Sequence, residues 1–220
     1  MRTILIVQDI MNRPDFSNYL AHFTKDGALC SASETNPAKA FEQMNAFDRL
    51  ISILNNQIIR ASIMPWTGAY AACFTECPWT SLLGHTQQYS CYGIGFSKQN
   101  IFAKHGGPAY YMRPDHFIKQ MKNRQFDKHV WPFVTPFSPQ YRPKHMKGTY
   151  FPTVDYCHER EWRVPHDYPF NLEDIEFVIV KNSNDLARFP QNLLDVIGVD
   201  KFIIMDNYKF IETLWPVHLM

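Results

Sequence analysis

The chain has 220 residues and a net charge of +1, from 22 basic and 21 acidic side chains. Hydrophobic residues make up 45% of it and charged residues 20%, a composition that supports a folded core and excludes a wholly disordered chain. No apolar run reaches the roughly 18 residues that a membrane-spanning helix needs, so no membrane association is expected.

The cysteines and the short motifs exclude several classes of site. The five cysteines contain no CxxC pair, and the first residues lack a small-residue cleavage site, so reduced thiols and a cytoplasmic location are expected. Neither a Walker A sequence nor a GxSxG motif is present. Zinc is not expected, because the spacing of Cys73, Cys77, His85 and Cys91 matches no common structural-zinc pattern.

The first half of the chain is predicted to combine short strands with helices. A strand is expected at 3–7, and a helix over 36–59 begins with Asn-Pro and carries apolar residues at helical spacing. Strands are expected at 71–75 and 92–97, the second with two glycines typical of a close backbone approach. A second helix is expected within 79–90.

A basic, aromatic and proline-rich insertion is predicted at 101–152. Within it, a strand at 109–112 is expected to pair beside the strand at 92–97, and a basic helix is expected at 113–124. Prolines interrupt 131–152, which is predicted to be a long loop without regular structure, and loops of that length are often functional.

The last third returns to strands and helices. Residues 159–164 alternate charged and apolar side chains, as a half-buried strand does. Strands are also expected at 175–181 and 201–205, on either side of a helix at 183–197. Because strands and helices do not alternate strictly, we expect a single α+β domain over residues 1–220.

Charge is distributed unevenly along the chain. Residues 101–148 contain nine Lys or Arg residues and two acids, a net charge of +7 that leaves −6 for the remainder. Cations that neutralise phosphates, interleaved with aromatic rings on which bases stack, favour nucleic-acid binding. A solvated helix and a loop with aromatic packing are the alternative. The residues expected to contact nucleic acid are Lys119, Lys122, Arg124, Lys128, Arg142, Lys144 and Lys147.

The sharpest local pattern is the run from Glu159 to Arg163. In a strand, Glu159, Glu161 and Arg163 would share one face. Two carboxylates so close repel each other, which raises the pKa of one of them. Such a pair can stabilise a developing cation or orient a sugar hydroxyl. An exposed strand with alternating charges is the plain alternative, and a metal-independent nuclease that uses both glutamates and His158 is another.

Two other segments carry polar side chains at strand ends. His22 and Thr24 lie two residues apart on an extended segment, so both can point at a ligand. A structural histidine bonded to the backbone is the alternative. Thr75 ends a buried strand, where it can line a cleft or cap the helix that follows.

Three segments together resemble a known family. YLAHFTKDG, ACFTECPWTSLLGHTQQYSCYGIGFSK and CHEREWRV occur in this order within residues 19–164. The ordered set resembles the AbiGi abortive-infection family of bacterial phage-resistance proteins. This resemblance implies a role in phage defence or in a toxin–antitoxin system, with a cognate toxin or antitoxin as a partner.

The chain is also distantly similar to the DarT-type ADP-ribosyltransferases, which modify DNA bases with NAD as the substrate. This resemblance implies split mixed and antiparallel sheets with flanking helices, and nucleic acid (DNA or RNA) as the acceptor. The catalytic residues that it implies are Glu161, Glu159 and Arg60. The NAD-binding residues that it implies are His22, Thr24, Phe74, Thr75 and Tyr89.

The alternative is a non-catalytic antitoxin or nucleic-acid-binding partner protein of an abortive-infection system. The two hypotheses differ in one geometric expectation. A transferase would place Glu161 in a cleft shared with His22 and Thr75. A binding module would leave Glu161 paired with Arg163 on an open surface.

Overall fold

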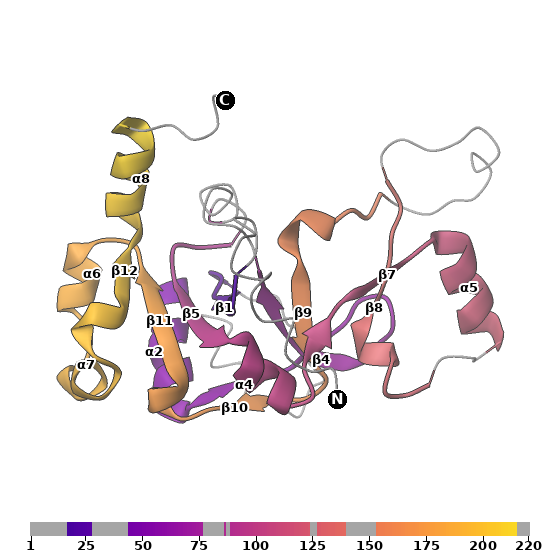
Figure 1. The fold of residues 1–220 in the computed structure, drawn as a ribbon, viewed down its shortest axis with the longest axis horizontal. Coiled ribbons are helices and arrows are strands. Elements are labelled where there is room, and N and C mark those ends of the chain that lie inside the picture. Colours follow the sequence, from indigo (N-terminus) through magenta and orange to yellow (C-terminus); the bar gives the residue numbers. More distant parts are fainter. Residues whose placement is uncertain are drawn as a thin grey trace, which may run out of the picture.

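A mixed β-sheet organises the protein (Figure 1). The computed structural model describes residues 17–27, 44–76, 86, 89–123, 127–139 and 153–214. Seven strands follow one another in the order β12-β11-β5-β1-β4-β9-β6, and β3 pairs with β4 beside this path. The strands are β1 (Tyr19–Phe23), β3 (Ser62–Ile63), β4 (Tyr70–Thr75), β5 (Gly93–Ser97), β6 (Gly107–Pro108), β9 (Glu161–Val164), β11 (Ile175–Val180) and β12 (Phe202–Ile204).

The predicted mixture of strands and helices is confirmed. The strands expected at 71–75, 92–97 and 175–181 form β4, β5 and β11, in the middle of the sheet. Gly95 of β5 makes the expected close approach, because a Cβ atom there would lie 2.3 Å from the Phe177 ring. The strand predicted at 3–7 and most of the helix predicted at 79–90 lie outside the described residues.

Helix α2 (Ala46–Asn56) covers one face of the sheet. The Asn45 side chain accepts a hydrogen bond from the backbone N–H of Asp48, which satisfies one of the free donors at the start of the helix. Its apolar stripe buries Phe47, Leu50 and Leu54 in the main core. The part of the predicted helix before residue 44 lies outside the described residues.

Aromatic rings fill the core beneath the sheet. Strand β10 (Tyr168–Pro169) pairs with β2 (Ile58–Ile59) and brings Tyr168 within 5.1 Å of Phe74 and 5.0 Å of Phe96, ring centre to ring centre. The rings meet edge to face, the arrangement that the aromatic quadrupole favours. Burial of each ring contributes about 1.5–3 kcal/mol, which makes this cluster a large part of the stability of the sheet.

The helix predicted at 183–197 is instead two helices. Helix α6 (Ser183–Ala187) ends before Pro190, and α7 (Gln191–Ile197) begins after it, because proline cannot continue the hydrogen-bond ladder of a helix. The two helices form the crossover between the parallel strands β11 and β12. Helix α8 (Met205–Leu214) follows β12 directly. No helix in the described part of the chain is long and apolar enough to span a bilayer.

A separate unit lies at the other edge of the sheet from α6, α7 and α8 (Figure 1). Helix α4 (Lys98–Ala103) leads from β5 to β6, beyond which the chain forms β7 (Tyr110–Met112), α5 (Pro114–Asn123), the 3₁₀ turn η2 (Trp131–Phe133) and β8 (Val134–Pro136). Strands β7 and β8 pair in parallel. We call the described residues 109–123 and 127–137 the arm.

Two predictions about the arm are wrong. The strand at 110–112 pairs with β8 and not with the strand at 93–97. The segment from 131 is not irregular, since it forms η2 and β8 before the described residues end at 139. Pro132 lies two residues before this short strand and Pro136 is its last residue, and prolines so placed obscure a strand in the sequence. The structure tolerates Pro136 because, among the described residues, β8 pairs only with β7 and so lies at an edge.

Strand pairing assigns each side chain to one of two faces. Ala21 lies opposite Thr75, and Thr75 lies opposite Glu161, so these three share one face, which we call the Glu161 face. His22 is adjacent to Ala21 and therefore points to the other face, which we call the core face because it packs against α2.

Candidate functional site

The two glutamates of the predicted pair lie on either side of a tight backbone turn. Glu159 ends the 3₁₀ turn η4 (Cys157–Glu159), and β9 begins only at Glu161. Arg160, between them, has a left-handed φ of 46°, which is uncommon for a residue other than glycine. The predicted strand from 159 is therefore two residues too long, and this turn, not strand alternation, sets the position of Glu159 relative to Glu161.

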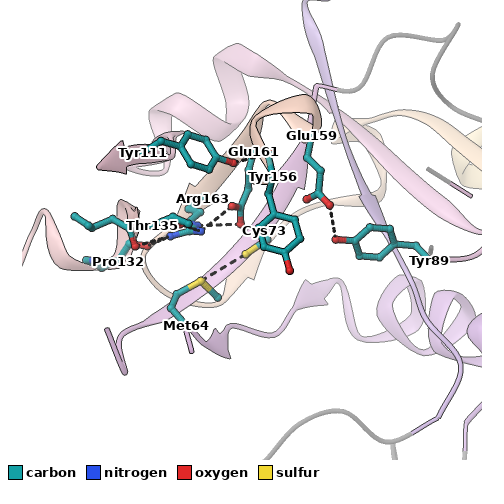
Figure 2. A network of polar contacts seen from close by, with 11 residues as sticks. Met64, Cys73, Tyr89, Tyr111, Pro132, Thr135, Tyr156, Glu159, Glu161 and Arg163 are labelled. Atoms are coloured by element: carbon teal, nitrogen blue, oxygen red, sulfur yellow. Dashed lines mark hydrogen bonds and ion pairs between the residues drawn. The ribbon is translucent and has the colours of Figure 1, made fainter. Parts of the chain in front are cut away.

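Glu161 forms a two-point ion pair with Arg163 (Figure 2). Arg163 Nε lies 2.9 Å from one carboxylate oxygen and Arg163 Nη2 lies 2.7 Å from the other. The Glu161 side chain keeps 13% of its surface exposed, against 4% for Arg163. As strand alternation predicts, both side chains lie on one face, and the guanidinium fixes the direction of the carboxylate.

Arg163 also binds the arm. Its Nη1 donates to the backbone oxygens of Pro132 and Val134, and its Nη2 donates to the Thr135 hydroxyl. Together with Glu161, these groups accept hydrogen bonds from all five N–H donors of the guanidinium. Burial lowers the pKa of Arg163, but the hydrogen bonds and negative charge of Glu161 outweigh burial, so the pKa is raised overall.

Glu159 has a different environment. Its side chain is buried, with 7% exposed, and one carboxyl oxygen accepts a hydrogen bond of 3.1 Å from the Tyr89 hydroxyl. Burial raises the pKa of Glu159, and the charge of Glu161 adds to this, while the Tyr89 hydrogen bond partly offsets both. The Thr75 hydroxyl donates to the backbone oxygen of Glu159 and so holds the turn against β4.

Cys73 and Tyr111 border the Glu161 carboxylate. Burial raises the pKa of both groups well above their usual values, and the charge of Glu161 raises each further. Both groups therefore stay protonated near neutral pH. The Tyr111 hydroxyl donates to the backbone oxygen of Tyr156, a residue that is 46% exposed.

The structure brings only part of the predicted NAD-binding set to the glutamates. Thr75 and Tyr89 lie beside Glu159. His22 and Phe74 lie on the core face, where their ring centres are 6.0 Å apart. The cleft that a transferase would share between His22 and Glu161 is therefore not formed, because the sheet itself lies between the two side chains.

Three of the predicted site residues have their contacts away from the two glutamates: His22, Thr24 and Arg60. His22 Nδ1 lies 2.9 Å from the backbone oxygen of Cys73, and burial lowers the pKa of His22. The Thr24 hydroxyl donates to the backbone oxygen of Ala46 at the start of α2. Arg60 forms a surface ion pair of 2.7 Å with Asp167. The first two are structural roles, as the alternative interpretation of His22 proposed.

The predicted nucleic-acid residues are partly described. Lys119 and Lys122 are exposed on α5, and Lys128 is exposed shortly after this helix. Arg124, Arg142, Lys144 and Lys147 lie outside the described residues. Helix α5 lies on the outer side of the arm, away from the central sheet (Figure 1).

The contacts between Arg163 and the arm could not be anticipated from residue spacing. Thr135 and the oxygens of Pro132 and Val134 reach Arg163 across about 30 residues of chain, without any local motif. Among the described residues, no three His, Cys, Asp or Glu side chains are grouped so as to hold a metal ion.

Comparison of the chain with protein-family models, curated proteins and solved structures finds no match.

Proposed function

We propose that the protein is an ADP-ribosyltransferase-like enzyme that cleaves NAD at Glu159 and Glu161 and transfers ADP-ribose to DNA or RNA. The observation that carries this proposal is the contrast between two neighbouring carboxyl groups. One is ion-paired with a buried arginine, and the other is buried against a tyrosine. Pairs of carboxyl groups whose environments differ in this way divide acid–base work between them in enzymes that act on glycosidic bonds.

In this proposal Glu161 stabilises the positive charge of the reaction. Breaking the bond between nicotinamide and ribose sends the bonding electrons to nicotinamide and leaves an oxocarbenium-like ribose. A carboxylate that is already oriented can stabilise that charge without reorganisation. The ion pair with Arg163 uses one lone pair on each oxygen, and each oxygen has a second lone pair that can accept a ribose hydroxyl.

Glu159 acts as the proton acceptor in the same proposal. An O–H or N–H group of the acceptor forms a bond to the ribose carbon as nicotinamide leaves, and its proton passes to Glu159. The raised pKa of Glu159 brings its proton affinity closer to neutral pH, which suits a general base. Tyr89 orients this carboxyl through its hydrogen bond.

The arm supplies the acceptor surface. Lys119, Lys122 and Lys128 present exposed cations that can neutralise phosphates, and the arm contacts the site through Arg163. Following the AbiGi resemblance, we assign this activity to bacterial anti-phage defence or a toxin–antitoxin system in the cytoplasm.

A non-catalytic antitoxin or nucleic-acid-binding partner is the second candidate. Two observations favour it. Both Glu161 oxygens already accept hydrogen bonds from Arg163, and His22, which a transferase was expected to bring into the same cleft, lies on the opposite face of the sheet. In that case Glu161 is a structural brace for the arm, and the arm alone binds nucleic acid or a cognate toxin.

Nicotinamide release tests the choice between them. Purified protein is incubated with NAD and with single-stranded DNA or RNA, and the nucleic acid is then examined by mass spectrometry for an added ADP-ribose. Glu161→Gln should lower nicotinamide release by about 10²–10³-fold, as loss of a transition-state contact does. Glu159→Gln should lower transfer to the acceptor, and Glu176→Gln, at an exposed position of β11, should change neither.

Two outcomes would contradict the transferase. Equal release by the wild type and by folded Glu161→Gln would remove Glu161 from the reaction. Tight nucleic-acid binding without any release of nicotinamide would favour the non-catalytic partner.

A further inference from the structure

The arm joins the sheet at the two residues that form the ion pair. On its way into β7, the backbone N–H of Ala109 donates to the backbone oxygen of Glu161 at 2.8 Å. On its way out, η2 and β8 supply the three groups that Arg163 binds. The start of the arm is therefore attached to the main chain of Glu161, and its end is attached to the partner of the Glu161 side chain.

The Arg163 guanidinium connects Glu161 to the arm, and each of its five N–H groups already donates a hydrogen bond. Figure 2 shows Arg163 between Glu161 on one side and Pro132 and Thr135 on the other. Arg163 is 3% exposed, Thr135 1% and Val134 0%. An unpaired donor in such a buried place carries a large desolvation penalty, so the guanidinium cannot release one side without finding another acceptor. A shift of β8 is therefore passed on to the carboxylate.

The outer side of the arm carries charge. Helix α5 begins two residues after β7 ends, and β7 pairs in parallel with β8, so the helix is connected through β7 to the strand that helps to hold Arg163. On α5, Phe117 is buried, whereas Lys119 and Lys122 are exposed. A polyanion bound to these lysines is therefore connected to Arg163 through α5, β7 and β8, in that order.

We propose that Arg163 is a positioning residue that couples nucleic-acid binding on α5 to the orientation of the Glu161 carboxylate. The proposal depends on the proposed function for the assignment of Glu161 as catalytic. Its consequence is that an acceptor on the arm sets the geometry of the carboxylate, so NAD is cleaved faster when an acceptor is bound. A ligand shifts such an equilibrium only through a difference in its contacts with the two states, and the arm provides that difference.

Hydrogen–deuterium exchange of the full chain tests the coupling without relying on activity. The probes are a single-stranded DNA oligonucleotide and its RNA equivalent, each added at saturating concentration. We expect either probe to change exchange in α5 and also in the segment 157–164, which carries Glu161 and Arg163. No change at 157–164 while α5 is protected, or no binding to α5 at all, would overturn the proposal.

Thr135→Val is the variant that isolates the connection, because it removes one acceptor of Arg163 and leaves the Glu161 ion pair in place. It should bind the oligonucleotide as the wild type does but lose at least half of the exchange response at 157–164. Thr135→Ser keeps the hydroxyl and should restore the response. Tyr92→Phe removes a hydroxyl hydrogen bond to Asp185, away from the arm, and should leave the response unchanged.

Nicotinamide release separates this proposal from the proposed function. Where the wild type cleaves NAD, the ratio of release with and without oligonucleotide should exceed one, and Thr135→Val should bring it towards one. An unchanged ratio in Thr135→Val, with an unchanged exchange response, would refute the coupling and leave the transferase intact. An exchange response without any release would support the coupling and refute the transferase.

Discussion

The two faces of the central sheet bury polar side chains by different means. On the core face, His22 is held by a backbone oxygen of the adjacent strand. On the Glu161 face, Arg163 is held by a carboxylate, a hydroxyl and two backbone oxygens that come from two separate parts of the chain. The first arrangement links two neighbouring strands of the sheet. The second connects a partly exposed carboxylate to the arm, and the proposed function and the proposed coupling both depend on that connection.

The largest expected difference between the faces is in stability. Arg163→Ala should lower the free energy of unfolding by about 3–5 kcal/mol, because it leaves the largely buried Glu161 carboxylate and three buried acceptors of the arm without their partner. His22→Asn, which can still donate to the Cys73 oxygen, should cost no more than about 1.5 kcal/mol, the value of one net hydrogen bond. Urea unfolding of both variants measures this, and similar losses would contradict the contrast between the faces.

A smaller effect sharpens the comparison through pH. The pKa of Glu159 is raised from its ordinary value of 4.5 in the folded protein, so the folded state binds the proton more tightly than the unfolded state. The stability gained in this way is complete below pH 4.5 and is lost as the pH rises through the folded pKa. Relative to Glu159→Gln, the wild type should therefore lose stability as the pH rises above 4.5.

His22 should show the opposite slope. Its pKa is lowered from 6.5, so the unfolded state binds the proton more tightly. The stability gained in this way is complete above pH 6.5 and is lost as the pH falls through the lowered folded value. Urea unfolding across this range should show the wild type losing stability relative to His22→Asn on acidification. The same sign of slope for both residues would contradict their assigned environments.

Much of the sheet could be predicted because its strands carry their own signals. Residues 175–181 are rich in β-branched and aromatic side chains, and residues 71–75 form a short run of small and apolar side chains. The alternation within β9 correctly predicts that Glu161 and Arg163 share a face. The face of His22 could not be predicted. A shift of one residue in strand register moves every side chain to the opposite face, and only the pairing with β4 and β5 decides it.

The rest of the site depends on contacts that no local pattern encodes. Arg160 adopts a left-handed conformation, although the residues that usually indicate one in a sequence are glycine, asparagine and aspartate. Strand β8 follows Pro132 and ends at Pro136, and it pairs with β7, more than 20 residues earlier in the chain. The bond between Thr135 and Arg163 follows from that pairing, so the arm and its attachment to Glu161 become visible only in the folded chain.

Nicotinamide release by Glu161→Gln and His22→Asn, each measured per folded molecule in the presence of single-stranded nucleic acid, is the most direct test of the division between the faces. We predict that Glu161→Gln loses about 10²–10³-fold in rate and that His22→Asn stays within a few-fold of the wild type. Loss of activity in His22→Asn as large as that in Glu161→Gln would contradict the assignment of the reaction to the Glu161 face.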